Sequence, residues 1–123
     1  MHDCPFCRDN WSGLDIVLQT AVDGRDIAII NPLDPVTEGH VLVIGATHTE
    51  SAADDPVQAA ALVQVAASYV RHRGIEANII TSVGPAATQT VRHTHLHIVP
   101  RRESDGLALP WSAPKRRGRR KAQ

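Results

Sequence analysis

The stretch Gln89–Arg102, QTVRHTHLHIVPRR, places three of the chain's seven histidines at every second position, 93, 95 and 97. In a β-strand, successive side chains point to opposite faces, so residues two apart share a face. The three imidazoles would therefore line one face of a strand, whereas on a helix they would not converge. Pro100 cannot donate to a strand ladder and is expected to end the strand. The side chains between the imidazoles would point into the core: Thr94, Leu96 and Ile98.

Four further strands are predicted upstream of the histidine strand. Residues 15–20 and 26–31 flank Asp23-Gly24, which is a strong signal for a two-residue hairpin. Residues 40–45 and 77–84 are apolar and rich in β-branched side chains. This order, with the helix described next, predicts an α+β domain in which an antiparallel sheet of about five strands carries one main helix.

The main helix is predicted between residues 54 and 74. Asp54 or Asp55 provides an N-cap, Pro56 suits the first turn, and Gly74 is placed to end the helix. Residues from Val57 to Tyr69 recur at helical spacing and are expected to form its buried face: Val57, Ala61, Leu62, Val65, Ser68 and Tyr69.

Charge divides the chain into a body and a tail. Six of the thirteen basic residues lie within 115–121, although the formal net charge of the 123 residues is zero. We therefore predict one domain over residues 1–110, followed by a basic, disordered tail over 111–123 that is a candidate contact for polyanions. No apolar run approaches the ~18 residues of a membrane span. The N-terminus lacks a secretory signal, so the expected location is cytoplasmic.

The two cysteines form a single pair, Cys4-Pro5-Phe6-Cys7. A disulfide is disfavoured in a cytoplasmic chain. A thioredoxin-type redox pair should follow a strand and open a helix, which this context does not offer. A zinc site needs two further ligands, and histidines elsewhere in the chain can supply them.

Several segments, in the same order along the chain, are similar to motifs of the histidine triad (HIT) superfamily. HTHLHIVPR resembles its signature, GHVLVI its strand before the helix, and GPAATQTV its loop ahead of the triad. CPFC and His48 resemble its zinc-carrying branches. The resemblance implies an α+β sheet domain, usually a homodimer, that hydrolyses or transfers nucleotides. The substrates that the resemblance implies are nucleoside phosphoramidates or dinucleoside polyphosphates.

The resemblance also assigns roles to single residues. His95 would be the nucleophile that attacks the α-phosphorus and forms a nucleotidyl-histidine intermediate. His97 would contact the phosphate or the leaving group, and His40 would support the triad. Gln89 and Thr90 would line the phosphate site. A structural zinc ion would be held by four residues, with no catalytic metal required: Cys4, Cys7, His48 and His93.

The sequence departs from the family pattern around the expected substrate site. Ser82 stands where many relatives have asparagine, and it can still donate a hydrogen bond to phosphate. Pro32 replaces the residue that often holds the ribose, which leaves the adjacent Asn31 as the candidate for ribose or base contacts. Thr88 replaces the glycine of Ala-Gly-Gln, and Gly45 replaces a proline.

The residues support histidine chemistry without the resemblance, but two other classes stay open. A neutral imidazole is a competent nucleophile near pH 7 when its far nitrogen is held by an acceptor. A metallohydrolase with a catalytic ion on the three histidines would want carboxylates nearby, and residues 77–102 contain none. The third class is a low-turnover nucleotide-binding module, or a protein that acts on nucleic-acid ends through the basic tail.

Overall fold

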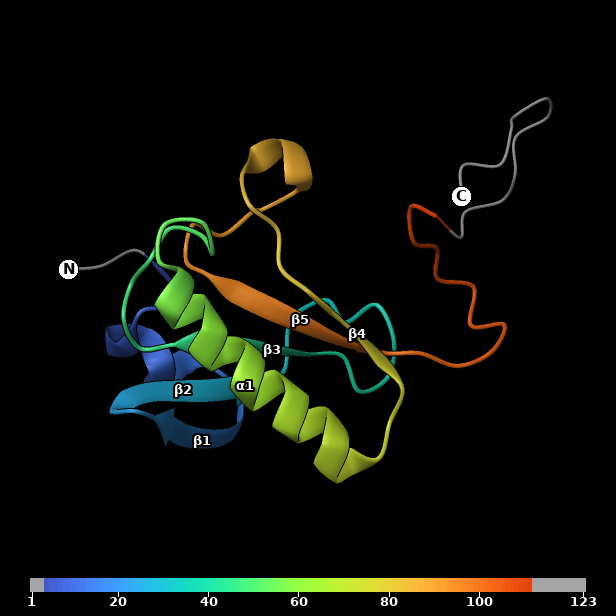
Figure 1. The fold of residues 1–123 in the computed structure, drawn as a ribbon, viewed down its shortest axis with the longest axis horizontal. Coiled ribbons are helices and arrows are strands. Elements are labelled where there is room, and N and C mark those ends of the chain that lie inside the picture. Colours follow the sequence, from blue (N-terminus) through green and yellow to red (C-terminus); the bar gives the residue numbers. More distant parts are fainter. Residues whose placement is uncertain (1–3, 112–123) are drawn as a thin grey trace.

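The computed structural model describes residues 4–111 and consists of one sheet, one long helix and two short 3-10 helices (Figure 1). All neighbouring strands are antiparallel, and their order is β1-β2-β3-β5-β4. This arrangement confirms the predicted α+β class. The elements are η1 Arg8–Gly13, β1 Ile16–Val22, β2 Arg25–Ile30, β3 Val41–Gly45, α1 Pro56–Arg73, β4 Ala77–Ile80, η2 Pro85–Ala87 and β5 His95–Pro100.

The predicted basic tail lies, apart from Trp111, outside the described residues. Within residues 4–111, no helix combines the length and the apolar character needed to cross a membrane.

Local sequence signals account for the hairpin and for both ends of the helix. Asp23 and Gly24 have φ angles of 50° and 78°, the left-handed conformation that a two-residue type I′ turn requires. The Asp55 side chain accepts the Gln58 backbone N–H at 3.1 Å and caps α1. At the other end, Gly74 adopts φ 63° and donates its N–H to carbonyls of the last turn.

The buried face of α1 differs from the predicted one at its first turn and at Ser68, which is exposed. Val57 is 62% exposed, and the core instead receives Gln58, which is 1% exposed. The Gln58 carboxamide oxygen accepts a hydrogen bond from Arg25 Nη1 at 2.7 Å, which satisfies a polar group that would otherwise be costly to bury. The other residues of this face were predicted, except Ala66: Ala61, Leu62 and Val65.

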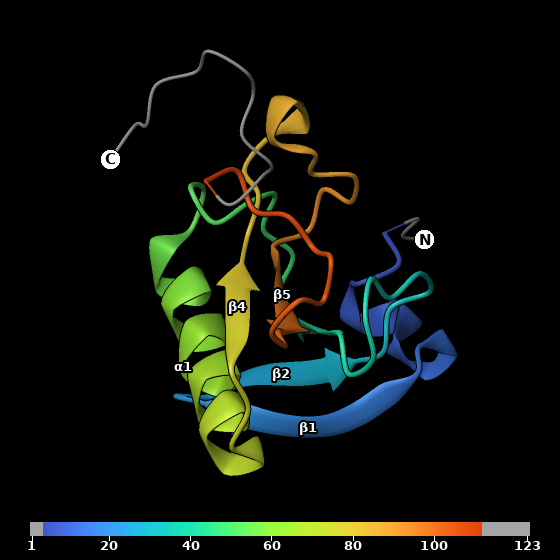
Figure 2. The same cartoon turned by 90° about the vertical axis from the view of Figure 1, so that its right-hand side faces the viewer.

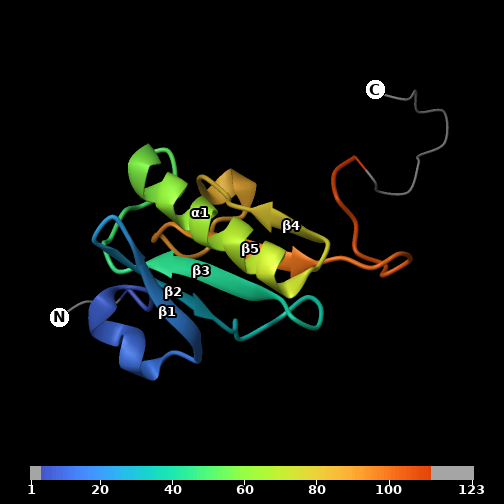
Figure 3. The ribbon, with the colours of Figure 1, turned by 60° about the horizontal axis from the view of Figure 1, so that its bottom comes forward.

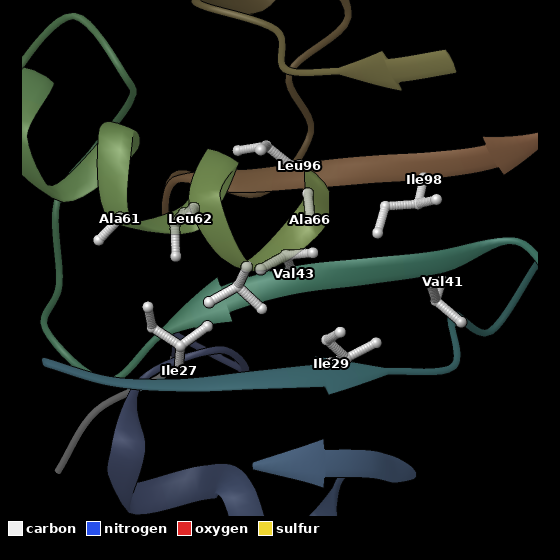
Figure 4. Packing of buried hydrophobic residues seen from close by; sticks show 10 residues of the cluster. Ile27, Ile29, Val41, Val43, Ala61, Leu62, Ala66, Leu96 and Ile98 are labelled. Carbon is white, nitrogen blue, oxygen red and sulfur yellow. The ribbon is translucent and has the colours of Figure 1, made fainter. Parts of the chain in front are cut away.

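Both faces of the central strands β2, β3 and β5 are covered, so the molecule has two apolar cores. The helix-side core joins α1 to β2, β3 and β5, and Figure 4 shows nine of its residues by name. The opposite core lies under the N-terminal segment, on the other side of the sheet from α1 (Figures 2 and 3), and contains Phe6, Trp11, Ala28, Ile30, Leu42 and Ile44. Burial on both sides explains the uninterrupted apolar runs of β2 and β3.

The first testable prediction concerns Gly45, at the end of β3. A Cβ atom there would overlap the buried Gln58 carboxamide. We expect Gly45→Ala to lower the free energy of unfolding by about 1–3 kcal/mol, measured by urea titration. Gly13→Ala is the matched control, because a Cβ at Gly13 meets open space. Gln58→Ala should relieve the overlap in a double mutant, and strictly additive effects would contradict this explanation.

Candidate active site and metal cluster

Strand β5 presents two of the three triad histidines, and the third lies just before the strand. His95 pairs with Ile44 of β3, and His97 pairs with Leu42. Leu96 and Ile98 point to the helix-side core and are at most 1% exposed. The predicted alternation is therefore present from His95 onward. His93 belongs to the bend that leads into β5, and its side chain contacts the Gly45 carbonyl and the cysteines.

The imidazole of His95 is held in one tautomer by the backbone. Its Nδ1 lies 2.8 Å from the His93 carbonyl oxygen, which can only accept a hydrogen bond. The proton is therefore on Nδ1, and Nε2 carries the lone pair. Burial lowers the pKa of His95, and the hydrogen bond to His93 opposes this shift only in part. His95 thus has a neutral ring with a basic Nε2 near pH 7, as a nucleophile requires.

A second hydrogen-bonded relay sets the tautomer of His97. The Val36 N–H donates to His40 Nδ1 at 3.0 Å, so the proton of the His40 ring is on Nε2. That N–H donates to His97 Nδ1, also at 3.0 Å, which leaves the proton of His97 on its Nε2. Burial, reinforced by the neighbouring His95 and His40, lowers the pKa of His97 to about 4. His97 is therefore a neutral hydrogen-bond donor near pH 7.

A cavity of about 300 Å³ opens beside His40 and His97. Ser82 and Thr88 add hydroxyl groups to its wall, and the assignment of Ser82 to phosphate binding stays a prediction. The remaining wall is mostly apolar. Eight further residues line it: Val36, Asn78, Ile80, Val99, Arg101, Leu107, Ala108 and Leu109. A larger hollow of about 440 Å³ lies between β1 and α1, but the triad does not line it.

The C-terminal part of the cavity wall was missed by sequence reasoning. Arg101 donates to both carboxylate oxygens of Asp105, at 2.9 and 3.1 Å, and to the Asn78 side chain and the Leu107 carbonyl, each at 2.7 Å. The Arg101 hydrogen bond holds the pKa of Asp105 well below its usual range. The only signal in the sequence was an arginine four residues before an aspartate, a spacing too common to single out.

The loop between η2 and β5 is closed by Gln89. Its carboxamide oxygen accepts the Gly84 N–H at 2.9 Å, and its nitrogen donates to the carbonyls of Glu50 and Val91 at 2.6 and 3.0 Å. Thr88 has φ 68°, a conformation that favours glycine and that threonine rarely adopts. The geometry gives Gln89 a role in shaping the loop, and Thr90 is exposed beside it.

Asn31 lies apart from this cavity. It is exposed and donates to the Asp15 carboxylate at 3.1 Å, beside the start of β1. The structure does not place Asn31 among the residues that line the His97 cavity. Its assignment to ribose or base contacts stays a prediction.

Four predicted metal ligands, distant in sequence, come together at the N-terminal edge of β5. The ligand atoms of Cys4, Cys7, His48 and His93 all lie within 4.8 Å of one another. The Nδ1 atoms of His48 and His93 are 3.2 Å apart, and Cys4 Sγ is 3.4 Å from His93 Nδ1. Cys7 Sγ lies 3.2 Å from His48 Nδ1 and 3.6 Å from His93 Nδ1. The cluster can therefore hold a metal ion.

The surroundings of the cluster favour metal binding through Nδ1. His93 Nε2 lies 2.8 Å from the Gly45 carbonyl and must carry the proton, so Nδ1 has the lone pair. His48 Nε2 faces Glu50 Oε2 at 3.4 Å, the carboxylate support common among metal-binding histidines. Burial and the Cys4 side chain raise the pKa of Cys7 to about 11, so a cation is needed to hold Cys7 as a thiolate near pH 7.

The second prediction follows from the lowered pKa of His97. In the unfolded chain His97 takes up a proton near pH 6.5, but in the folded chain only near pH 4. The unfolded state therefore binds more protons in this window, and the free energy of unfolding should fall as pH drops from 6.5 toward 4. His97→Asn should show a weaker decline than wild type in urea titrations across this range. His72→Asn, on the exposed face of α1, is the control; equal slopes for all three proteins would contradict the prediction.

Comparison with known proteins identifies the family. Residues 19–104 match the HIT domain family. Adenylylsulfatase HINT3 of Arabidopsis thaliana is 30% identical over 112 residues, which cover 86% of this chain and 56% of the plant protein, so the chain spans little more than half of that relative. An uncharacterized HIT-like protein of Mycobacterium tuberculosis is 36% identical over 112 residues, covering 86% of this chain and 76% of that protein.

A solved structure of a zinc-bound protein also matches this chain in fold. The zinc-bound histidine triad family protein from Mycobacterium smegmatis is 34% identical, with a TM-score of 0.70 over 86% of this chain and 80% of that chain. The family match, the identity to these relatives and the shared fold agree, and this chain belongs to the HIT family.

Proposed function

We propose that this HIT-family protein of the nucleotide hydrolase or transferase type acts through a nucleotidyl-histidine intermediate on His95. One observation carries the proposal: the His93 carbonyl holds the proton of His95 on Nδ1, so Nε2 carries the lone pair. The neutral donor His97 stands two residues further along the same strand face, with ring centroids 5.3 Å apart. A nucleophile and a donor for the developing negative charge are thus placed side by side.

The reaction proceeds in two balanced steps. His95 Nε2 attacks the α-phosphorus, a phosphorus–nitrogen bond forms, and the leaving group departs with the electrons of its bond and a proton from water. The nucleotidylated ring is then an imidazolium, and the His93 carbonyl accepts its Nδ1–H. Water or another acceptor attacks the same phosphorus, loses a proton to solvent, and releases the nucleotide with the original ring. His97 stabilises both transition states as a hydrogen-bond donor, because a group with a pKa of about 4 is not a proton reservoir near pH 7.

The cavity beside His97 favours a nucleoside phosphoramidate over a dinucleoside polyphosphate. A polyphosphate leaving group carries several negative charges and is best bound by free cationic groups. Among the described residues that line the cavity, the permanent cation is Arg101, and its Nε, Nη1 and Nη2 atoms already donate to Asp105, Asn78 and Leu107. An uncharged organic amine suits the mostly apolar remainder of the wall.

The third prediction tests the nucleophile. His95→Ala should abolish turnover of a nucleoside phosphoramidate, because no other group replaces the attacking nitrogen. His97→Ala should lose about 10²–10³ in rate, because it removes one transition-state donor. His72→Ala removes an exposed histidine of α1 and should leave turnover unchanged. Near-normal turnover by His95→Ala, for every substrate that wild type accepts, would overturn the assignment.

The Cys and His cluster suits a structural zinc ion better than a catalytic metal ion. Tetrahedral bonds of about 2.0–2.1 Å to nitrogen and about 2.3 Å to sulfur place ligand atoms about 3.3–3.8 Å apart. The four Cys and His contacts in the cluster are 3.2–3.6 Å. Two thiolates and two imidazoles would give a zinc ion the four ligands of a closed structural site, with no position for a reacting water. Because this site would use His93, the three triad histidines would no longer be available together, which argues against a metallohydrolase with a catalytic ion on all three.

The fourth prediction concerns this zinc. Purified protein should contain about one zinc ion per chain by elemental analysis. Cys4→Ser should lose the metal and lower the melting temperature, because the Cys4–Cys7 turn would lose its link to His48 and His93. The melting temperature of wild type treated with a chelator is compared with that of the Cys4→Ser protein. Wild type that contains no metal, or that is equally stable with and without it, would contradict the proposal.

Homodimer formation and the two alternative functions are also proposals. Strand β4 forms one edge of the sheet, where Ile79 and Ile80 are 39% and 37% exposed, and Val83, which follows β4, is 48% exposed. These apolar side chains support a homodimer contact there. The alternatives are a nucleotide-binding module with little turnover, and a protein that processes nucleic-acid ends through its basic tail. Removal of residues 115–121 separates them, because only a tail-dependent activity would change.

A further inference from the structure

The carbonyl that sets the tautomer of the proposed nucleophile belongs to a residue outside the sheet ladder. Pairing between β3 and β5 begins at Ile44 and His95, so His93 lies before the paired segment. Its position depends on its ring, which lies between the Gly45 carbonyl and the metal cluster, and on the next residue. The Thr94 N–H donates to the Thr49 carbonyl at 2.8 Å. The metal cluster is thus one of the anchors of the His93 carbonyl.

Phe6, between the two cysteines, contacts the nucleophile directly. Its ring centroid lies 5.2 Å from that of His95, with an interplanar angle of 71°, and 6.1 Å from that of His93 at 87°. Phe6 is 8% exposed and belongs to the core opposite the helix. Trp11 Nε1–H donates to the Phe6 carbonyl at 2.9 Å and holds the Cys4–Cys7 turn against this core. Two edge-to-face contacts therefore join the Cys4–Cys7 turn to both histidines.

We propose that Phe6 is a positioning residue for His95, and that the Cys4–Cys7 turn, when it holds its metal, orients the nucleophile through Phe6 and through the His93 carbonyl. The inference rests on the proposed function, since it concerns the same nucleophile. It extends that function by giving the metal cluster a role in catalysis as well as in folding.

The physical reason lies in the torsion of the imidazole. Rotation about the bond between Cβ and the ring is broad and roughly two-fold. A half-turn would place Cδ2–H, not Nδ1–H, against the His93 carbonyl, and the proton could then move to Nε2, the attacking atom. A flat ring packed against the imidazole at a steep angle blocks this half-turn. A flexible aliphatic side chain of similar volume fills the space without the same restriction.

The test compares Phe6→Leu with Ile30→Val, a change in the same apolar core at a residue outside the ring contacts. The ring nitrogen shifts of His95 are recorded by NMR in substrate-free protein, and kcat, KM, bound zinc and unfolding free energy are measured alongside. We expect Phe6→Leu to retain zinc but to populate both tautomers of His95. Its kcat should fall on the order of 10–10²-fold with little change in KM, as small misplacements of a reacting group do. Ile30→Val should keep the single tautomer.

Removal of zinc from wild type supplies the second arm, and His95 should again populate both tautomers. Retention of one Nδ1–H tautomer with unchanged kcat in Phe6→Leu would overturn the role of Phe6. Equal changes in Ile30→Val would overturn it as well, by showing a general effect of core stability. A single tautomer in zinc-free wild type would overturn the role of the metal. The NMR readout needs no substrate, so failure of the proposed reaction is seen separately as a wild type that turns over no nucleotide.

Discussion

The 2.8 Å hydrogen bond from His95 Nδ1 to the His93 carbonyl is the interaction on which the proposed chemistry depends. It determines which ring nitrogen carries the lone pair. The rest of the fold places its two partners. Strand β5 holds His95 against β3, and the Thr81 hydroxyl donates to the His95 carbonyl at 2.9 Å. The metal cluster and the Gly45 carbonyl hold His93. The apolar cores on the two faces of β2, β3 and β5 support these anchors.

The four histidines near β5 are oriented by fixed donors and acceptors, three of them through the backbone. The Val36 N–H orients His40, the Gly45 carbonyl orients His93, and the His93 carbonyl orients His95. Backbone groups do not titrate, so this arrangement keeps its polarity over a wide range of pH. Burial lowers the pKa of His40, His95 and His97 and keeps all three neutral near pH 7. Neutral rings serve a nucleophile and a donor better than imidazolium ions would.

Much of this arrangement could be predicted from sequence, because the deciding signals are local. Asp23-Gly24 requires a tight turn, Asp55 and Gly74 bracket the helix, and the alternation of His95, Leu96 and His97 separates two faces of a strand. The four candidate metal ligands were predicted by resemblance, since spacing alone leaves a Cys-x-x-Cys pair ambiguous. Their convergence within 4.8 Å agrees with that prediction.

Features that depend on tertiary contacts were not predictable in the same way. Nothing local shows that His93 precedes the ladder, that Gln58 replaces Val57 in the core, or that a second core forms around Phe6 and Trp11. The roles of Gln89 and Arg101 likewise depend on carbonyls and carboxylates brought close by folding. In each case a polar or aromatic side chain satisfies a partner that only the folded chain supplies.

The most direct test of the central claim is to trap the intermediate. Wild-type protein is mixed with a nucleoside phosphoramidate, quenched during turnover under conditions that preserve phosphorus–nitrogen bonds, and analysed by peptide mass spectrometry and phosphorus NMR. The nucleotide should be found on His95, bonded through Nε2. A nucleotide attached to another residue or through Nδ1, or turnover in which no bound nucleotide accumulates even when the acceptor step is slowed, would contradict the claim.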